Sequence, residues 1–293
     1  MSAGRFAPSP SGPLHLGNLR TAMIAWAVAR QSGAKFYLRI DDIDPGRNRA
    51  VDQQIRELEW LGIDWDGDII YQSKRRDLYE DALRTLEADG NVFECYCSRK
   101  DIREAVRAPH SPMSHYPGTC LENITVKTGK PAALRLRPNV TEWRVLDELS
   151  GEVVGPIDAF VLRRGDGWPA YNLASVVDDI LLGIDHVVRG DDLLEATPGQ
   201  EYLAHLLGAR PIKYVHVPLV LGEGGARLAK RDGAVTIEDM NLSQDRVLEV
   251  LTGSMGIKKC GDMESFLNEF RIENLPRHAV RFGTFEGKPE LRM

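Results

Sequence analysis

The chain has 293 residues, of which 43% are hydrophobic, so it can bury a sizeable core as one large domain or as a main domain with smaller attachments. Its net charge of -6 at pH 7 argues against a protein that coats nucleic acid, although one local groove can still bind it. No apolar stretch approaches the roughly 20 residues of a membrane span. The first residues, MSAGRFAPSP, lack the basic and apolar regions of a secretory signal, so we expect a cytoplasmic protein.

The first part of the chain alternates between strand and helix patterns. A short strand is expected within GRFAPSP (4–10), a helix over 19–33, and a second strand within KFYLRIDDID (35–44). These three elements make a βαβ unit. Two further amphipathic helices are expected over 51–63 and 75–90.

The alternation breaks off and then resumes. Residues 93–165 contain cysteines, a proline-bearing loop and strand-like runs such as AALRLRP, which indicates an insertion. Beyond it, HVVRG (186–190) and KYVHVPLVLG (213–222) are predicted strands, with a predicted helix over 197–208 between them. Strands that alternate with helices on both sides of an insertion indicate an α/β fold with one split parallel sheet. The expected units are a split Rossmann-like domain, the insertion and a short helical C-terminal stub: residues 1–92 with 166–240, residues 93–165, and residues 241–293.

The loop PSPSGPLHLGN (8–18) joins the first predicted strand to the first predicted helix. In an open parallel sheet, ligands bind beyond the carboxyl ends of the strands, where a helix N-terminus offers N–H groups and partial positive charge. Gly12 and Gly17 would let the backbone approach a ligand closely, and His15 can donate to a phosphate oxygen. The spacing matches neither the dinucleotide pattern G-x-G-x-x-G nor the P-loop. The residues suit a nucleotide, although a lone histidine in such a loop is more often structural or solvated.

PSPSGPLHLGN resembles the HIGH signature of class I aminoacyl-tRNA synthetases, in the form used by the glutamyl branch, with Asn18 in place of the second histidine. RLAKR (227–231) resembles their second signature, the KMSKS loop. There Arg227 and Ala229 replace the usual lysine and serine, whereas Lys230 is retained. The resemblance continues through RIDDID, YNLASVVDD and HVVRGDDLL. It implies a Rossmann-like class I synthetase catalytic domain.

The resemblance implies activation of an amino acid by ATP, in which the substrate carboxylate attacks the α-phosphorus and magnesium pyrophosphate leaves. This step needs cations and donors that stabilise negative charge, and no nucleophile from the protein. By resemblance, His15 and Asn18 hold phosphate oxygens, and Gly17 makes room for the nucleotide base. Lys230, helped by Arg231, stabilises the pyrophosphate. His15 and Lys230 are the expected catalytic residues, and loss of Lys230 is expected to slow activation by roughly two to three powers of ten.

A glutamate substrate carries two carboxylates and one ammonium, so its pocket needs two cations and an acid. Arg5 and Arg189 fit the first need, because a planar guanidinium binds carboxylates bidentately. By resemblance, Asp41 holds the α-ammonium with help from Ser9, and Tyr171 lines the pocket. The family usually has glutamate at the place of Asp41. Without the motifs, both arginines are as readily explained as salt-bridge residues.

Three of the four cysteines fall within the predicted insertion, where clustered thiols in a reducing compartment suggest a metal. Structural zinc takes four ligands in a tetrahedron. Cys95, Cys97 and Cys120 supply three thiols. For the fourth ligand the residues leave three candidates open: His110, His115 and Tyr116. The resemblance favours Tyr116, because it matches the family's Y-x3-C spacing. The zinc would be structural and would hold the insertion that meets the acceptor end of the tRNA. The alternative is that these are ordinary buried free cysteines, which three cysteines so close together in a loop-rich insertion disfavour.

The end of the chain bears on which member of the family it resembles. A full glutamyl-tRNA synthetase continues beyond the second signature with helical domains that read the anticodon, and about fifty residues cannot make them. The resemblance is therefore to short paralogues, expected to be monomers, that transfer glutamate to the queuosine base at the wobble position of tRNA(Asp). Alternatives are a small synthetase that charges tRNA(Glu), a nucleotidyltransferase of the same superfamily, and a non-catalytic synthetase-like regulator.

Overall fold

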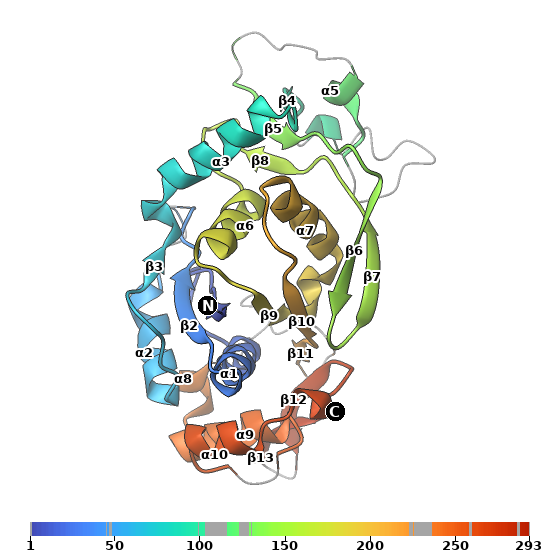
Figure 1. Ribbon diagram of the computed structural model, residues 1–293. Coiled ribbons are helices and arrows are strands. Elements are labelled where there is room, and N and C mark those ends of the chain that lie inside the picture. Colours follow the sequence, from blue (N-terminus) through green and yellow to red (C-terminus); the bar gives the residue numbers. More distant parts are fainter. Residues whose placement is uncertain are drawn as a thin grey trace.

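The structure is a computed structural model, and it describes residues 2–44, 46, 49–98, 100–102, 116–122, 129, 131–222, 225, 236–257, 260–285 and 288–292. Figure 1 shows a central α/β body, with the predicted insertion at one end and the C-terminal part at the other. The N-terminus lies within this central body, and the first strand starts there.

Two groups of parallel strands form the centre of the molecule. β1 (Ala3–Phe6) pairs with β2 (Lys35–Ile40), which pairs with the short β3 (Ile70–Tyr71). In the second group, β9 (His186–Gly190) pairs with β10 (Lys213–Val217). β1 lies beside β9, and there the N–H of Asp185 donates to the carbonyl of Ala3 at 3.1 Å. Strands from both sides of the insertion are thus neighbours, which confirms the predicted parallel α/β fold.

Helices connect these strands. The segments are α1 (Leu16–Gln31), α2 (Val51–Leu61), α3 (Arg76–Ala88), α6 (Tyr171–Leu181) and α7 (Thr197–Leu206), with 3-10 turns at Gln72–Lys74 and Asp191–Ala196. Each of these five helices is followed within two residues by a glycine in the left-handed conformation that side chains disfavour, for example Gly33 after α1, with φ of 66°, and Gly62 after α2, with φ of 88°. Pro198 lies in the first turn of α7, where its missing N–H costs nothing.

The insertion forms a small antiparallel sheet and a hairpin. β4 (Val92–Cys95), β5 (Ala133–Leu136) and β8 (Val161–Arg163) make the sheet, and α5 (Thr119–Glu122) lies near β4. β6 (Glu142–Asp147) and β7 (Gly151–Pro156) make the hairpin, whose turn is held by Asp147 Oδ1 accepting the N–H groups of Leu149 and Ser150. β6 also pairs in parallel with β10. The insertion is therefore joined to the central sheet through this hairpin.

The C-terminal part contains helices and a hairpin. α8 (Ile237–Met240) precedes the expected helical stub, α9 (Gln244–Gly253) and α10 (Met263–Glu269) are helices within it, and a 3-10 turn follows at Ile272–Asn274. The chain then forms the hairpin of β12 (Val280–Phe285) and β13 (Lys288–Arg292), which the sequence analysis did not predict. β12 pairs in parallel with β11 (Val220–Leu221), which Pro218 separates from β10 because proline has no N–H for a ladder.

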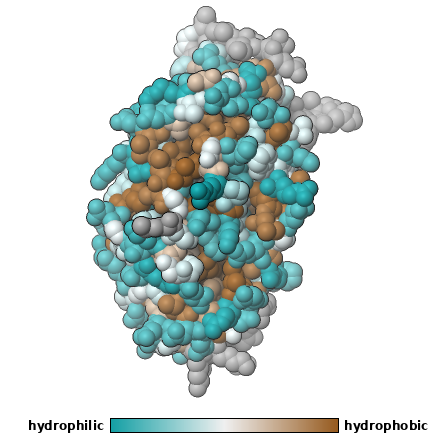
Figure 2. All heavy atoms as spheres, in the orientation of Figure 1, coloured by the Kyte–Doolittle hydropathy of each residue, from teal (hydrophilic) through white to brown (hydrophobic). Residues whose placement is uncertain are grey.

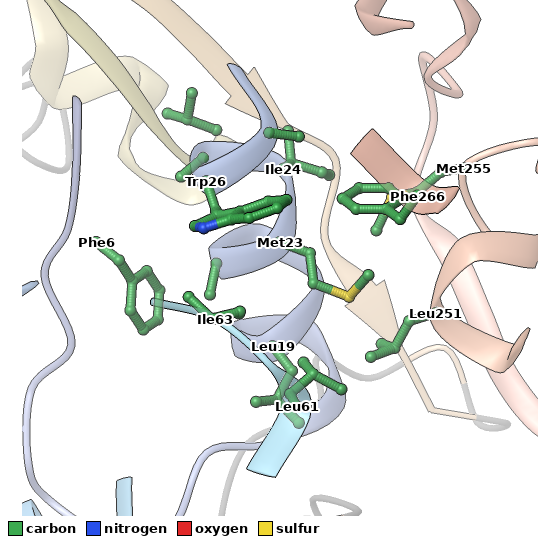
Figure 3. Packing of buried hydrophobic residues seen from close by; sticks show 14 of the residues in the cluster. Phe6, Leu19, Met23, Ile24, Trp26, Leu61, Ile63, Leu251, Met255 and Phe266 are labelled. Atoms are coloured by element: carbon green, nitrogen blue, oxygen red, sulfur yellow. The ribbon is translucent and has the colours of Figure 1, made fainter. Parts of the chain in front are cut away.

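The largest hydrophobic core joins α1 to the C-terminal part. Figure 3 shows Met23 and Ile24 of α1 facing Leu251, Met255 and Phe266, and all five side chains are buried. Burial of one such side chain stabilises a fold by roughly 1.5–3 kcal/mol. The C-terminal part therefore completes the core of the central α/β body.

Apolar residues gather around the middle of the face seen in Figure 1, whereas hydrophilic residues dominate its edge (Figure 2). Among the helices that the structure describes, none combines the length and the apolar character needed to span a bilayer. This agrees with the lack of a long apolar stretch in the sequence.

Candidate active site and cysteine cluster

A cavity of about 530 Å³ lies at the carboxyl ends of β1, β2, β9 and β10, beside the N-terminus of α1. Its volume is typical of small-molecule sites. The predicted site residues that line it are Arg5, Ser9, His15, Gly17, Asn18, Asp41, Tyr171 and Arg189. Lys230 and Arg231, predicted to bind ATP, lie outside the described residues. The predicted ATP and glutamate residues of the described chain thus share one cavity.

His15 is the N-cap residue of α1. Its Nδ1 accepts the N–H of Asn18 at 3.2 Å, and Asn18 Oδ1 accepts the N–H of His15 at 3.3 Å, which completes a capping box. Because Nδ1 is an acceptor, a neutral ring carries its proton on Nε2. The first turn of α1 contains no acidic residue to offset its partial positive charge. Nε2 is therefore the atom that can donate to an anion at this helix terminus.

Gly17 packs against the ring of His15. A Cβ atom at position 17 would lie 3.0 Å from His15 Cε1, 3.1 Å from His15 Nδ1 and 3.5 Å from Val220 Cβ. The first two contacts are tighter than Cβ atoms normally make, so a side chain here would displace the imidazole. That Gly17 makes room for the nucleotide base stays a prediction. The structure shows in addition that the ring of His15 leaves little room for a side chain at position 17.

A buried row of alternating charges adjoins the cavity. Arg5 Nε donates to Asp179 Oδ1 at 3.2 Å, and Arg39 Nη1 donates to the same oxygen at 2.7 Å. Arg39 Nε donates to Asp41 Oδ1 at 2.7 Å. Burial acts to lower the pKa of Arg39, but the carboxylates of Asp41 and Asp179 outweigh it and raise that pKa well above its usual value. Asp41 thus faces the cavity as the partner of Arg39.

Arg189 is held by neutral groups. Its Nε donates to His216 Nε2 at 3.0 Å, its Nη1 to Gln200 Oε1 at 2.7 Å and its Nη2 to Thr197 Oγ1 at 2.7 Å. Burial lowers the pKa of Arg189, and the positive charge of Arg5 lowers it further. Since these three acceptors are uncharged, an anion in the cavity is well placed to compensate the guanidinium charge.

His216 links Arg189 to the insertion. Because His216 Nε2 accepts from Arg189, the proton of the neutral ring lies on Nδ1 and is donated to Asp147 Oδ2 at 2.8 Å. The backbone N–H of His216 donates to the same oxygen at 2.9 Å. Burial lowers the pKa of His216, although the hydrogen bond to Asp147 opposes this shift. A neutral His216 therefore orients Arg189 from the neighbouring strand.

Residues 3–273 match the family described as tRNA synthetases class I (E and Q), catalytic domain. The chain belongs to this family. The Glutamyl-Q tRNA(Asp) synthetase of Nocardia farcinica is 51% identical over 284 residues, which cover 94% of this chain and 91% of that protein. Glutamate--tRNA ligase 1 of Acidithiobacillus ferrooxidans is 39% identical over 298 residues, which cover 98% of this chain and 63% of that protein.

A solved structure supports the fold of this class I synthetase domain. The glutamate tRNA ligase of Elizabethkingia meningosepticum, solved in complex with its amino acid, superposes with a TM-score of 0.81. The match covers 96% of this chain and 67% of that one, at 24% sequence identity. This likeness confirms the α/β class I architecture of the chain.

Several buried polar residues beside the cavity of this class I domain were not predicted from the sequence. Two of them carried a signal, because Arg39 interrupts the apolar strand KFYLRI and His216 interrupts KYVHV. A polar group inside a buried strand needs a partner. The sequence does not indicate which residues are the partners, because Asp179 is 140 residues from Arg39 and Asp147 is 69 residues from His216.

The predicted metal ligands lie together in the insertion. The Sγ atoms of Cys95, Cys97 and Cys120 lie within 4.8 Å of one another and form a group that could hold a metal ion. The hydroxyl of Tyr116 lies 3.3 Å from Cys95 Sγ and 3.7 Å from Cys97 Sγ. The three converging thiols fit three of the four ligand positions of a tetrahedral zinc site, and the phenol of Tyr116 lies beside them. Outside the described residues lie the alternative ligands His110 and His115.

Tyr116 is held from several sides. Its N–H donates to Asp158 Oδ1 at 2.9 Å, and the guanidinium carbon of Arg135 lies 4.1 Å from the centre of its ring. The cysteine cluster belongs to a small hydrophobic group with Phe93 and Ala159, which is separate from the core around α1. The cluster thus organises the insertion and not the cavity.

Proposed function

We propose that this chain activates L-glutamate with ATP and transfers the glutamyl group to the queuosine base at the wobble position of tRNA(Asp). In the first step a glutamate carboxylate oxygen attacks the α-phosphorus, the bond to pyrophosphate breaks, and glutamyl-adenylate forms. In the second step the queuosine base takes the glutamyl group and AMP leaves.

The observation that carries the proposal is the presence of Arg5 and Arg189 in one cavity with the N-terminus of α1. Two guanidinium groups suit a substrate with two carboxylates. The helix terminus and His15 Nε2 suit the phosphates of ATP. The cavity therefore offers separate groups for an acidic amino acid and a nucleotide.

Comparison of relatives supports the choice of acceptor. The relative named for glutamyl-Q tRNA(Asp) synthesis is 51% identical to this chain, whereas the glutamate–tRNA ligase is 39% identical. The higher identity favours transfer to tRNA(Asp) over charging of tRNA(Glu).

Each predicted site residue has a place in this reaction. The ATP-binding residues are His15, Gly17, Asn18, Lys230 and Arg231, and the glutamate-binding residues are Arg5, Ser9, Asp41, Tyr171 and Arg189. His15 and Lys230 stabilise the charge that develops on the phosphates, which is the main demand of an in-line displacement. The carboxylate of Asp41 accepts a hydrogen bond from the substrate ammonium while it keeps its hydrogen bond from Arg39.

We assign structural zinc to Cys95, Cys97, Tyr116 and Cys120, where it would fix the fold of the insertion. Magnesium enters with ATP and compensates the charge of its phosphates. A cytoplasmic location is in keeping with cysteines that form no disulfide, and a monomeric state is the expectation from the family resemblance.

Exchange of radioactive pyrophosphate into ATP tests the first step. Exchange is expected to require L-glutamate and to proceed without tRNA. If exchange does not depend on glutamate, the chain is a nucleotidyltransferase for another small molecule. A lack of exchange with every amino acid, with or without tRNA, would identify a non-catalytic regulator.

Transfer of radioactive glutamate tests the second step. The acceptors are tRNA(Asp) with queuosine, tRNA(Asp) without it, and tRNA(Glu). Label is expected on the first alone. Label on tRNA(Glu) would instead establish a small glutamyl-tRNA synthetase.

A further inference from the structure

The loop over residues 8–14 belongs to no helix or strand, so its backbone groups need partners elsewhere. The loop contains Ser9 and leads directly into His15, and both line the cavity. Three main-chain hydrogen bonds support it: the N–H of Asp41 donates to the carbonyl of Pro8 at 3.0 Å, and the N–H groups of Arg49 and Ala50 donate to the carbonyl of Pro10 at 3.2 and 3.3 Å. Much of the remaining support comes from two side chains of α2.

Gln54 joins two separate points of this loop. Its Nε2 donates to the carbonyl of Ser9 at 3.1 Å and to the carbonyl of Gly12 at 2.6 Å. The residue is 2% exposed, so water does not replace these bonds readily. Because one amide nitrogen serves both carbonyls, Gln54 fixes the separation of Ser9 and Gly12. An acceptor in the same place would face two carbonyl oxygens and would be repelled.

Glu57 supports the last residue of the loop. Its Oε2 accepts the N–H of Leu14 at 2.7 Å, and the residue is 7% exposed. Leu14 directly precedes His15, so this bond fixes the backbone at the point where the imidazole leaves it.

Gln54 and Glu57 are three residues apart and share one face of α2. α2 itself is firmly placed, because Leu58 and Leu61 are buried in the same core as α1. The two side chains therefore connect a rigid helix to a loop without regular structure. Among the described residues that line the cavity, neither Gln54 nor Glu57 occurs, so neither is positioned to touch a substrate.

We propose that Gln54 and Glu57, together the α2 clamp, are positioning residues that hold Ser9 and His15 in their binding geometry before substrates arrive. The inference rests on the proposed function for the roles of Ser9 and His15. Preorganised donors need no rearrangement at the moment of reaction, which is where much of their catalytic value lies. Gln54 acts first on Ser9 and the glutamate side, whereas Glu57 acts on His15 and the ATP side.

The test compares Gln54→Met, Glu57→Met and the conservative Glu57→Gln, which retains an acceptor for Leu14. Glu59→Met serves as the matched control, because Glu59 is exposed on the same helix. In glutamate-dependent pyrophosphate exchange, Glu57→Met is expected to raise the KM for ATP roughly three- to tenfold, with the KM for glutamate changed by less than about twofold. Gln54→Met is expected to show the larger effect on the KM for glutamate. Glu57→Gln and Glu59→Met should resemble the parent protein.

Hydrogen exchange of the Leu14 amide provides a readout that does not need activity. It should be faster in Glu57→Met than in the parent protein, Glu57→Gln and Glu59→Met. Equal amide exchange and equal KM values in Glu57→Met and the parent protein would overturn the α2 clamp while leaving the proposed function intact. If the parent protein shows no glutamate-dependent exchange, the proposed function fails and the amide measurement alone decides the clamp. If Gln54→Met does not fold, the two Glu57 variants carry the test.

Discussion

Arg189 Nε donates to His216 Nε2 at 3.0 Å, and this bond determines which nitrogen of His216 carries the proton. The neutral ring must donate from Nδ1, and Asp147 Oδ2 lies 2.8 Å away to accept. A protonated ring would instead turn an N–H toward the guanidinium and place two positive charges together. The orientation of Arg189 therefore depends on a histidine that stays neutral.

Acidification should destabilise the fold through His216. Burial lowers its pKa in the folded state below the usual value of 6.5, even though Asp147 opposes the shift. As the pH falls below about 6.5, the unfolded chain binds a proton that the folded chain does not, so the free energy of unfolding falls by at most about 1.4 kcal/mol per pH unit from this group. His216→Asn should therefore show a smaller drop in Tm than the parent protein between about pH 7.5 and 5.5.

Thermal unfolding at both pH values measures this difference. His278→Asn is the control, because His278 is exposed, and its Tm should follow the pH dependence of the parent protein. Equal pH dependence in His216→Asn and the parent protein would contradict a folded state that keeps His216 neutral.

Arg189→Gln and Arg5→Gln should separate substrate binding from stability. Each removes a cation from the cavity, so each is expected to raise the KM for glutamate by roughly tenfold or more. Arg5 also pairs with the buried carboxylate of Asp179, so Arg5→Gln should cost about 3 kcal/mol of unfolding free energy. Arg189 has neutral partners, so Arg189→Gln should cost about 1 kcal/mol. Exchange kinetics and urea unfolding measure the two effects, and equal stability losses would contradict the distinction.

Part of the fold and part of the site could be predicted from the sequence. β9 and β10 were predicted because apolar runs between turn residues have a local signature. Arg5 and Arg189 were identified from motifs, and the structure brings both to one cavity. The pairing of Arg39 with Asp179 could not be predicted, because the two residues are 140 positions apart. The sequence indicates only that a buried arginine needs a partner of negative charge. The role of Lys230 stays a prediction.

The C-terminal hairpin was missed for a related reason. β12 contains a glycine and one charged residue, Arg281, and gains its place by pairing with β11 and β13. Strand propensity depends on such neighbours more than on the residues themselves. A helical reading of residues 241–293 was therefore correct for α9 and α10 and wrong for the final strands.

Gly17→Ala should impair ATP use. Its Cβ would lie 3.0 Å from His15 Cε1, and a shift of the imidazole moves the donor that faces the phosphates. A misplaced group of this kind is expected to raise the KM for ATP roughly tenfold. The control is Gly253→Ala in α9, where a Cβ meets no atom within 4 Å. Equal KM values for ATP in the two variants would show that the His15 ring tolerates the added methyl group.

Removal of metal should affect the two proposed steps differently. The cysteine cluster packs with Phe93 and Ala159, apart from the core around α1, so loss of zinc should unfold the part of the insertion around the cluster and leave the cavity and the β6–β7 hairpin in place. Chelation, or Cys120→Ser, is therefore expected to abolish transfer to tRNA while glutamate-dependent exchange stays within about twofold of the untreated protein. Metal analysis should give one zinc per chain before treatment. Exchange that is lost together with transfer would show instead that the zinc also stabilises the catalytic unit, since β6, a strand of the insertion, pairs with β10 beside Arg189.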